Sequence, residues 1–143
     1  QRPIEKGVIL LAAHVSQVEY LLQSLSPQMQ QTVIDSWTHR SPTERAITWL
    51  LPADQQVPAW IKGGHSKVAV RVTTHPLCVA LCHAFNGCIV STSANPAGDA
   101  PATSLQQAHQ YFSDQLNYLD GDLGLSQQAS RIIDAETGVV IRA

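Results

Sequence analysis

Residues 67–95 read KVAVRVTTHPLCVALCHAFNGCIVSTSAN, which predicts a strand, a helix and a second strand in direct succession. Valines alternate with other residues in the first part, so they share one face of a strand while Arg71 lies on the other. Pro76 suits the first turn of a helix that runs to about Phe85, and an Asn-Gly pair ends it. A polar loop follows the second strand at its carboxyl end, where open sheets commonly bind ligands.

Outward from this stretch, the chain continues to mix strands and helices. Short apolar or alternating runs predict strands at residues 8–13, 47–51, 131–134 and 139–142. Capping residues predict helices that begin at Ser16, at Pro27 and at Thr103 or Ser104. This pattern indicates an α/β or α+β sheet domain.

Length and composition predict one compact unit. With 143 residues, of which 44% are hydrophobic, residues 1–143 can bury a core as a single domain. No apolar run is long enough to cross a bilayer, and the start lacks the features of a signal peptide, so we expect a cytoplasmic protein with no membrane contact. The odd number of cysteines and the absence of a CxxC pair favour buried thiols.

The net charge of the chain argues against strong electrostatic binding of nucleic acid. A formal net charge of −2 is not that of a protein that holds nucleic acid mainly through phosphates, so any RNA contact is expected to be local or weak. The six histidines are scattered without ligand spacing, which predicts no tightly bound metal.

The loop from Ser91 to Gly98 is the most informative segment for function. Its hydroxyls, amide and glycine at the end of a strand could bind an oxyanion such as phosphate. The same composition is also typical of a turn whose hydroxyls bond their own backbone.

The amino-acid sequences of several segments resemble motifs of one family. Ser91-Thr-Ser-Ala-Asn95, between an apolar strand and Gly98, is similar to the S-T-S-A-N signature of the YrdC/TsaC family. Other segments resemble further motifs of the family, in the family's order. Residues 1–7 resemble the end of its K-x-R motif, residues 68–72 its A-V-R-V strand, and residues 74–77 the start of the helix that follows. Residues 130–134 and 137–143 resemble its closing strands. The resemblance therefore covers nearly the whole chain.

This resemblance implies a twisted open mixed sheet with flanking helices and a concave basic cavity. It also implies an L-threonylcarbamoyladenylate synthase, which forms threonylcarbamoyl-AMP and pyrophosphate from ATP, L-threonine and bicarbonate, with Mg²⁺ accompanying the ATP. The product serves N6-threonylcarbamoyladenosine modification at position 37 of tRNA, through downstream transfer proteins.

The resemblance assigns roles to residues by their motif positions. On this basis Arg2 and Arg71 are expected to be catalytic, because the reaction depends on orientation and charge neutralisation. ATP would be bound by Arg2, Lys6, Ser93 and Asn95, and threonine with the carbamoyl group by Arg71, Ser91 and Ser130. Without the resemblance, a surface arginine, a solvated chain start and a strand-end cap would be the favoured explanations of Arg71, of Arg2 with Lys6, and of Ser130.

The chain also departs from the family's pattern. The family's first strand and helix, with the leading lysine of K-x-R, have no counterpart here, which would leave an unpaired sheet edge. The usual W-P-G-P-T segment is replaced after Trp37 by a longer polar insert, residues 38–47, with two arginines, which is expected to be a mobile surface loop. Lys67 stands where relatives usually carry Ser or Thr, and could aid phosphate binding or crowd the site.

Three hypotheses follow from these patterns. The first is the synthase, or a fragment or diverged copy of it that has lost activity. The second is a non-catalytic module that binds tRNA or double-stranded RNA through Arg2, Lys6, Lys67 and Arg71. The third is a carbamoyl-transfer domain of hydrogenase-maturation proteins, which ranks last because no acylphosphatase or zinc-finger segment is present in the sequence.

Overall fold

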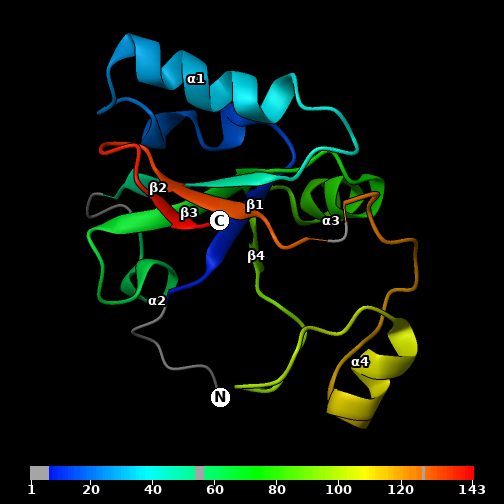
Figure 1. Cartoon of the computed structure of the whole chain (residues 1–143). Helices are drawn as coiled ribbons and strands as arrows, with labels where there is room; N and C mark the ends of the chain where they lie inside the picture. Colours follow the sequence, from blue (N-terminus) through cyan, green and yellow to red (C-terminus); the bar gives the residue numbers. More distant parts are fainter. Residues whose placement is uncertain (1–6, 54–56, 127) are drawn as a thin grey trace.

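A six-stranded mixed sheet runs through the computed structural model, which describes residues 7–53, 57–126 and 128–143 (Figure 1). The strands are β1 (Ile9–Ala12), β2 (Ile47–Pro52), β3 (Lys67–Val72), β4 (Ile89–Ser91), β5 (Arg131–Asp134) and β6 (Val140–Arg142). Their spatial order is β4-β1-β3-β2-β5-β6. The pairs β1–β3 and β2–β5 are parallel and the other three are antiparallel. The predicted α/β fold with an open mixed sheet is confirmed.

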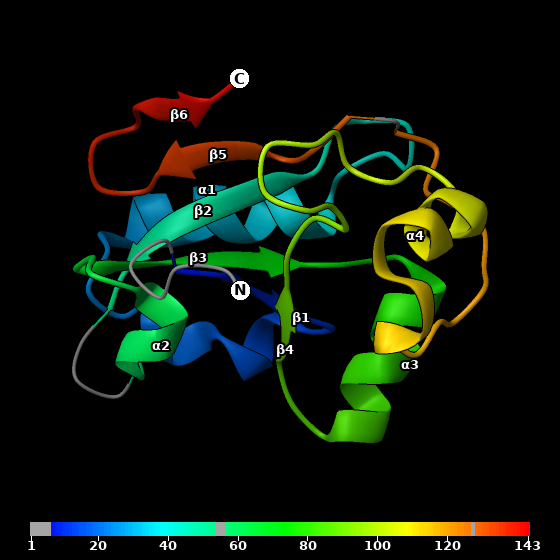
Figure 2. The ribbon, with the colours of Figure 1, turned by 90° about the horizontal axis from the view of Figure 1, so that it is seen from below.

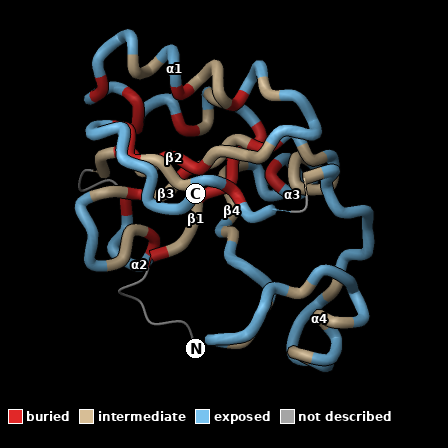
Figure 3. The backbone as a smooth tube through the Cα atoms, in the orientation of Figure 1, coloured by how far each residue is buried: buried red, intermediate tan, exposed pale blue. Residues whose placement is uncertain are grey.

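One face of the sheet carries the hydrophobic core. Helix α1 (Pro27–Thr38) and two short 3₁₀ turns, η2 (Val15–Gln17) and η3 (Glu19–Leu21), cover this face. Buried residues gather between them and the sheet (Figure 3), among them Leu22, Val33, Leu51, Val68 and Val70. Because side chains alternate along a strand, the apolar half of β2 and β3 points into this layer.

The opposite face of the sheet carries the polar side chains. In the register of the strands, Ala69 of β3 lies beside Ile9 of β1 and Leu50 of β2, and Ile9 in turn lies beside Ser91 of β4. Arg71, two residues after Ala69, therefore shares a face with Ser91. Figure 2 looks onto this face, which has α2 (Ala59–Lys62) at one end and α3 (Pro76–Phe85) with α4 (Leu105–Phe112) at the other.

Helix α3 leads the chain from β3 to β4 as the sequence predicts. It begins with Pro76 and ends where Asn86 adopts a left-handed conformation, with φ of 56°. The N–H of Gly87 then donates to the carbonyl of Cys82 at 3.1 Å, which satisfies an otherwise unpaired group at the helix end. This sharp stop lets β4 run back antiparallel to β1 and places the loop after Ser91 beyond the polar face.

Helix α4 also begins at a predicted cap, followed by a short 3₁₀ turn, η4 (Ser113–Gln115). The hydroxyl of Ser104 accepts a hydrogen bond from the N–H of Gln107 at 3.1 Å, and the Gln107 side chain accepts one from the N–H of Thr103 at 2.9 Å. No helix in the described part of the chain is long and apolar enough to cross a membrane.

The prediction of a helix that starts at a capping box on Ser16 is wrong. The structure has the turns η2 and η3 instead, and His14 occupies the N-cap of the first. The Gln17 side chain accepts hydrogen bonds from the backbone N–H groups of Ala13 and His14, at 2.8 and 3.1 Å, which holds a tight turn rather than a helix start. Val18 and Leu22 are still buried, so the hydrophobic spacing predicted the buried face but not the backbone.

Replacement of Leu51 by alanine tests the core layer. Leu51 is 0% exposed, so we expect L51A to lower the free energy of unfolding by about 2–5 kcal/mol, measured by urea unfolding followed by circular dichroism. Leu119 is 62% exposed, and L119A should change that free energy by less than about 0.5 kcal/mol. Equal effects of the two variants would contradict this assignment of the core.

Candidate active site

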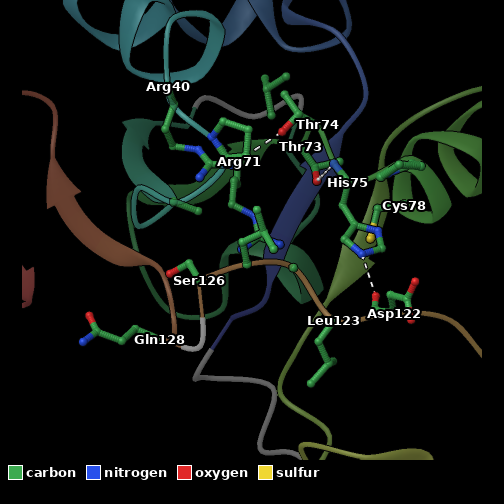
Figure 4. Close-up of a pocket in the computed structure, with 16 residues that line it drawn as sticks. Arg40, Arg71, Thr73, Thr74, His75, Cys78, Asp122, Leu123, Ser126 and Gln128 are labelled. Carbon is green, nitrogen blue, oxygen red and sulfur yellow. Dashed lines mark hydrogen bonds between the residues drawn. The ribbon is translucent and has the colours of Figure 1, made fainter.

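A cavity of about 420 Å³ opens at the carboxyl end of β3 (Figure 4). Three segments far apart in the sequence form it: the insert between α1 and β2, the junction of β3 with α3, and residues 122–128, of which all but 127 are described. The residues that supply polar groups to its lining are Arg40, Arg71, Thr73, Thr74, His75, Cys78, Asp122, Ser126 and Gln128. The parallel strands β1 and β3 both end here, which is the usual place for a ligand in an open sheet.

Arg71 is the central cation of this cavity. Its Nε is buried and has no hydrogen-bond partner, and no carboxylate within the described ranges forms an ion pair with it. Burial lowers the pKa of the guanidinium, and the positive charges of Arg40 and Arg142 lower it further. A buried cation without a counter-charge is costly unless an anion binds to it. The cavity is therefore suited to an anionic ligand.

Polar groups beside Arg71 are fixed by the start of α3. The Thr73 hydroxyl accepts a hydrogen bond from the backbone N–H of His75 at 3.1 Å. The His75 Nε2 lies 2.9 Å from the carbonyl oxygen of Asp122 and donates to it, which ties residues 122–128 to α3. The Nδ1 atom is buried without a partner and is an acceptor in the neutral ring with that tautomer. The cavity wall thus combines the guanidinium groups of Arg40 and Arg71 with hydroxyls and an imidazole ring.

Cys78 lines the same cavity but is poorly suited to nucleophilic attack. Burial raises the pKa of its thiol, which disfavours the reactive thiolate. All three cysteines are free thiols, and Cys82 is fully buried, as the sequence predicts for apolar surroundings. Cys78 and Cys88 are only half-buried.

Ser130 lies on the polar face and positions an arginine that the sequence analysis did not select. Ser130 is 4% exposed, and its hydroxyl lies 2.8 Å from that of Thr48. Arg142 of β6 donates from Nη2 to this hydroxyl at 3.0 Å and from Nε to the Ser130 carbonyl at 2.9 Å. Ser130 therefore holds the guanidinium of Arg142 on the polar face. The signal in the sequence was that Arg142 is the one charged residue of the predicted strand 139–142, and the structure pairs it with Ile132.

A second hollow of about 420 Å³ lies further along the same face, lined by residues that include Gly7, Ile9, Ala69, Ile132 and Arg142. Lys67 also lines it, but its ammonium is engaged: Nζ lies 2.6 Å from Asp134 Oδ2 and 2.7 Å from Glu136 Oε2. The hydrogen bond with Asp134 is the main cause that raises the pKa of Lys67. This pairing leaves Lys67 less able to neutralise a phosphate than an unpaired lysine would be.

The residues predicted for the nucleotide are brought together only in part. Ser91 lies on the face that carries Arg71, but Ser93 and Asn95 follow it in the loop and line neither hollow. The Asn95 amide donates to the carbonyls of Pro96 and Asp99 at 2.8 and 3.0 Å, which closes its own loop. Its Oδ1 atom is buried without a partner and is the group left for a ligand. Arg2 and Lys6 lie outside the described residues.

The insert at 38–47 contributes to the site, which the sequence analysis did not foresee. It was expected to be a mobile surface loop, yet Arg40 reaches the cavity, and Glu44 Oε2 accepts a hydrogen bond from the N–H of Ser41 at 3.0 Å. Its two arginines were the available signal, but nothing in the sequence places them near Arg71. As for metals, the described part of the chain has no cluster of three or more His, Cys, Asp or Glu side chains that could hold an ion.

Comparisons with known proteins show the family of the chain. The sequence model of the Sua5/YciO/YrdC family, described as "Telomere recombination", matches residues 1–143. Threonylcarbamoyl-AMP synthase of Acinetobacter baumannii (strain ATCC 17978) is 72% identical over 142 residues, which cover 99% of this chain and 75% of the relative. The synthase of Acinetobacter baylyi is 71% identical over 143 residues, which cover 99% and 74%.

Solved structures of P. abyssi Sua5 share the fold. A double variant of that protein has a TM-score of 0.80 at 27% identity, over 94% of this chain and 40% of that one. P. abyssi Sua5 complexed with L-threonine has a TM-score of 0.76 at 27% identity, over 93% and 38%. The present chain thus spans about two fifths of the length of Sua5 and about three quarters of the synthases.

Replacement of Asp134 tests the ion pair at the second hollow. Burial alone would raise the pKa of Asp134, but hydrogen bonds from Lys67 and from the N–H groups of Thr137 and Glu136 lower it below its usual range. The ionised carboxylate therefore stabilises the fold at neutral pH, and this stabilisation is lost as the pH falls through the lowered pKa. We expect D134N to unfold at a lower urea concentration than wild type at pH 7.

The same variant should show a smaller difference from wild type below about pH 4, because the carboxylate takes up a proton there in the unfolded chain and, at still lower pH, in the folded protein. D114N, at an exposed site in η4, is the matched control and should unfold like wild type at both pH values. A D134N deficit that stays constant down to pH 2.5 or so would refute the role of the charge.

Proposed function

Because this chain belongs to the Sua5/YciO/YrdC family, we propose that it is a threonylcarbamoyl-AMP synthase, the name that relatives 72% identical to it carry. In this proposal it forms threonylcarbamoyl-AMP and pyrophosphate from ATP, L-threonine and bicarbonate. The single structural observation that supports it is the half-buried Arg71 side chain, whose buried Nε has no hydrogen-bond partner and which has no carboxylate partner among the described side chains.

The proposed chemistry needs such cations. The deprotonated amino nitrogen of threonine adds to the carbon of bicarbonate with loss of water, or to carbon dioxide with loss of a proton from nitrogen, and forms a carbamate. A carbamate oxygen then attacks the α-phosphorus of ATP, and the bond to the pyrophosphate oxygen breaks. The carbamate and ATP both carry net negative charge, so their approach requires neutralisation of charge and fixed orientation. Arg71 supplies this charge at the cavity, and Arg142, held by Ser130, supplies it from β6.

We place L-threonine in the cavity at the end of β3. The support for this is that P. abyssi Sua5 complexed with L-threonine has a similar fold, and that the cavity combines arginines with hydroxyls of Thr73 and Thr74. A carboxylate matches the fork of donors on a guanidinium. The threonine amino and hydroxyl groups would find acceptors such as His75 Nδ1.

We place ATP, with Mg²⁺, across the polar face toward the loop after β4. Ser93 is exposed there, and Asn95 has a buried Oδ1 atom that could accept from the nucleotide. Arg2 and Lys6 keep their expected role on the phosphates. Lys67, paired with two carboxylates, would shape the second hollow rather than bind phosphate directly.

The wider role of the product is part of the same proposal. Threonylcarbamoyl-AMP would serve modification of adenosine 37 in tRNA through downstream transfer proteins, with at most a weak direct contact to tRNA or double-stranded RNA. The free thiols of the three cysteines are consistent with the reducing cytoplasm. The names that close relatives carry favour the synthase over a catalytically inert RNA-binding module.

An assay of pyrophosphate release tests this function. With ATP, Mg²⁺, L-threonine and bicarbonate, we expect turnover by wild type, and a fall of about 10²-fold or more in kcat/KM for R71Q, because the central neutralising charge is lost. R131Q removes one positive charge from an exposed position of β5 and should stay within about twofold of wild type. Release of pyrophosphate that does not require threonine would refute the assignment.

Calorimetric titration with ATP and Mg²⁺ tests the nucleotide site separately. S93A should weaken ATP binding by about tenfold, the usual effect of losing one hydrogen bond to a charged group. S24A is the control, because Ser24 is an exposed serine that precedes α1, the helix on the opposite face of the sheet. Equal affinities of S93A and wild type would remove Ser93 from the site.

A further inference from the structure

The insert of residues 38–47 gives the cavity a second arginine beside Arg71. Arg40 follows the end of α1, and its side chain extends over the carboxyl end of β3 toward Arg71 and Thr74 (Figure 4). The two guanidinium groups are close enough that the charge of Arg40 contributes to lowering the pKa of Arg71. Neither forms an ion pair with a carboxylate in the described part of the chain.

Arg40 is held in place through one of its terminal nitrogens. Its Nη1 donates to the backbone carbonyls of Ser41, at 3.2 Å, and of Glu44. Its Nη2 is within 3.5 Å of the Thr74 hydroxyl, the outer limit of a hydrogen bond. The insert is itself closed by the bond between Glu44 and the N–H of Ser41. The guanidinium is therefore oriented before any ligand arrives.

The edge of the Arg40 guanidinium formed by Nε and Nη2 has N–H groups that can donate to a ligand. Among the hydrogen bonds of the described residues, none uses Arg40 Nε, and Nη2 uses one of its two hydrogens at most. Two parallel N–H donors on one edge of a guanidinium match the two oxygens of a carboxylate or phosphate group. Arg71 Nε is unsatisfied in the same cavity.

A purely structural role for Arg40 does not account for this arrangement. Bonds to two carbonyls could be made by a neutral side chain, which would avoid placing a second positive charge next to a buried arginine. Like charges this close destabilise the empty cavity and are relieved when an anion lies between them. The energetic cost of the pair is recovered only in the liganded state.

We propose that Arg40 is a substrate-binding residue that, together with Arg71, holds one oxyanion of a substrate in the cavity at the end of β3. The oxyanion is a carboxylate or phosphate group, supplied by L-threonine or by ATP. This inference rests on the proposed function for the identity of the substrates, but not for the binding of an oxyanion. It assigns to the insert a role in affinity for one substrate rather than in the chemical step.

Steady-state kinetics of R40Q decide which substrate is held. Loss of a two-pronged contact predicts a rise of at least tenfold in one KM, for threonine or for ATP, with the other KM and kcat within about twofold. A change confined to threonine assigns the carboxylate, and a change confined to ATP assigns a phosphate. R40K should recover only part of the loss, because an ammonium cannot form the fork. Unchanged KM values for both substrates would overturn the proposal.

Controls separate binding from folding and from the proposed function. R131Q, which removes an exposed charge from β5, should leave both KM values unchanged, and thermal unfolding should show R40Q folded at the assay temperature. If the wild-type protein has no synthase activity, the proposed function fails. Titration of the wild-type and R40Q proteins with inorganic pyrophosphate then still tests whether Arg40 binds an oxyanion. Binding to wild type at least tenfold tighter than to R40Q supports the proposal, whereas equal or undetectable binding to both refutes it.

Discussion

The alternation of side chains along β3 is the constraint on which the rest of the molecule depends. Val68 and Val70 point to one face and are completely buried, while Lys67 and Arg71 point to the other. β3 lies near the middle of the sheet, with β1 and β2 as its neighbours, so its register sets the faces of both. A slip by one residue would bury a cation in the core and expose the valines. Core and site are therefore specified by the same strand.

The two faces differ because only one is closed by a helical layer. Helix α1 and the turns η2 and η3 cover the apolar face, and Val33 and Trp37 of α1 are buried against it. On the polar face, the described elements stand at the ends of the sheet rather than across it, which leaves the two hollows. Arg71 and Arg142 remain on that face with positive charge that no described carboxylate pairs. This unpaired positive charge favours the binding of anions on that face.

The two hollows differ in how their charges are balanced. At the second hollow, the Lys67 ammonium is paired with the carboxylates of Asp134 and Glu136 at 2.6 and 2.7 Å, and Arg142 is a lining cation without a carboxylate partner among the described residues. At the cavity beside α3, both Arg40 and Arg71 have no carboxylate partner among the described residues. A paired cation stabilises the fold, whereas two cations without carboxylate partners create a positive potential that favours anions. This difference supports placing the neutralising chemistry at the end of β3.

The sequence by itself determined the strands, the caps of α1, α3 and α4, the polar face of β3 and, through the motif around Ser91 to Asn95, the family. These features depend on near neighbours: a period of two, a proline at a first helical turn, a left-handed residue at a helix end. It misjudged the turns at residues 15–21, because the Gln17 side chain competes with a helix start. Three contacts became visible only in the tertiary structure: Arg40 lies in the same cavity as Arg71, Ser130 positions Arg142, and Lys67 is paired with two carboxylates. Such contacts join residues 12 to 69 positions apart. Which of these residues meet depends on how the strands are ordered in the sheet, and no local pattern encodes that order.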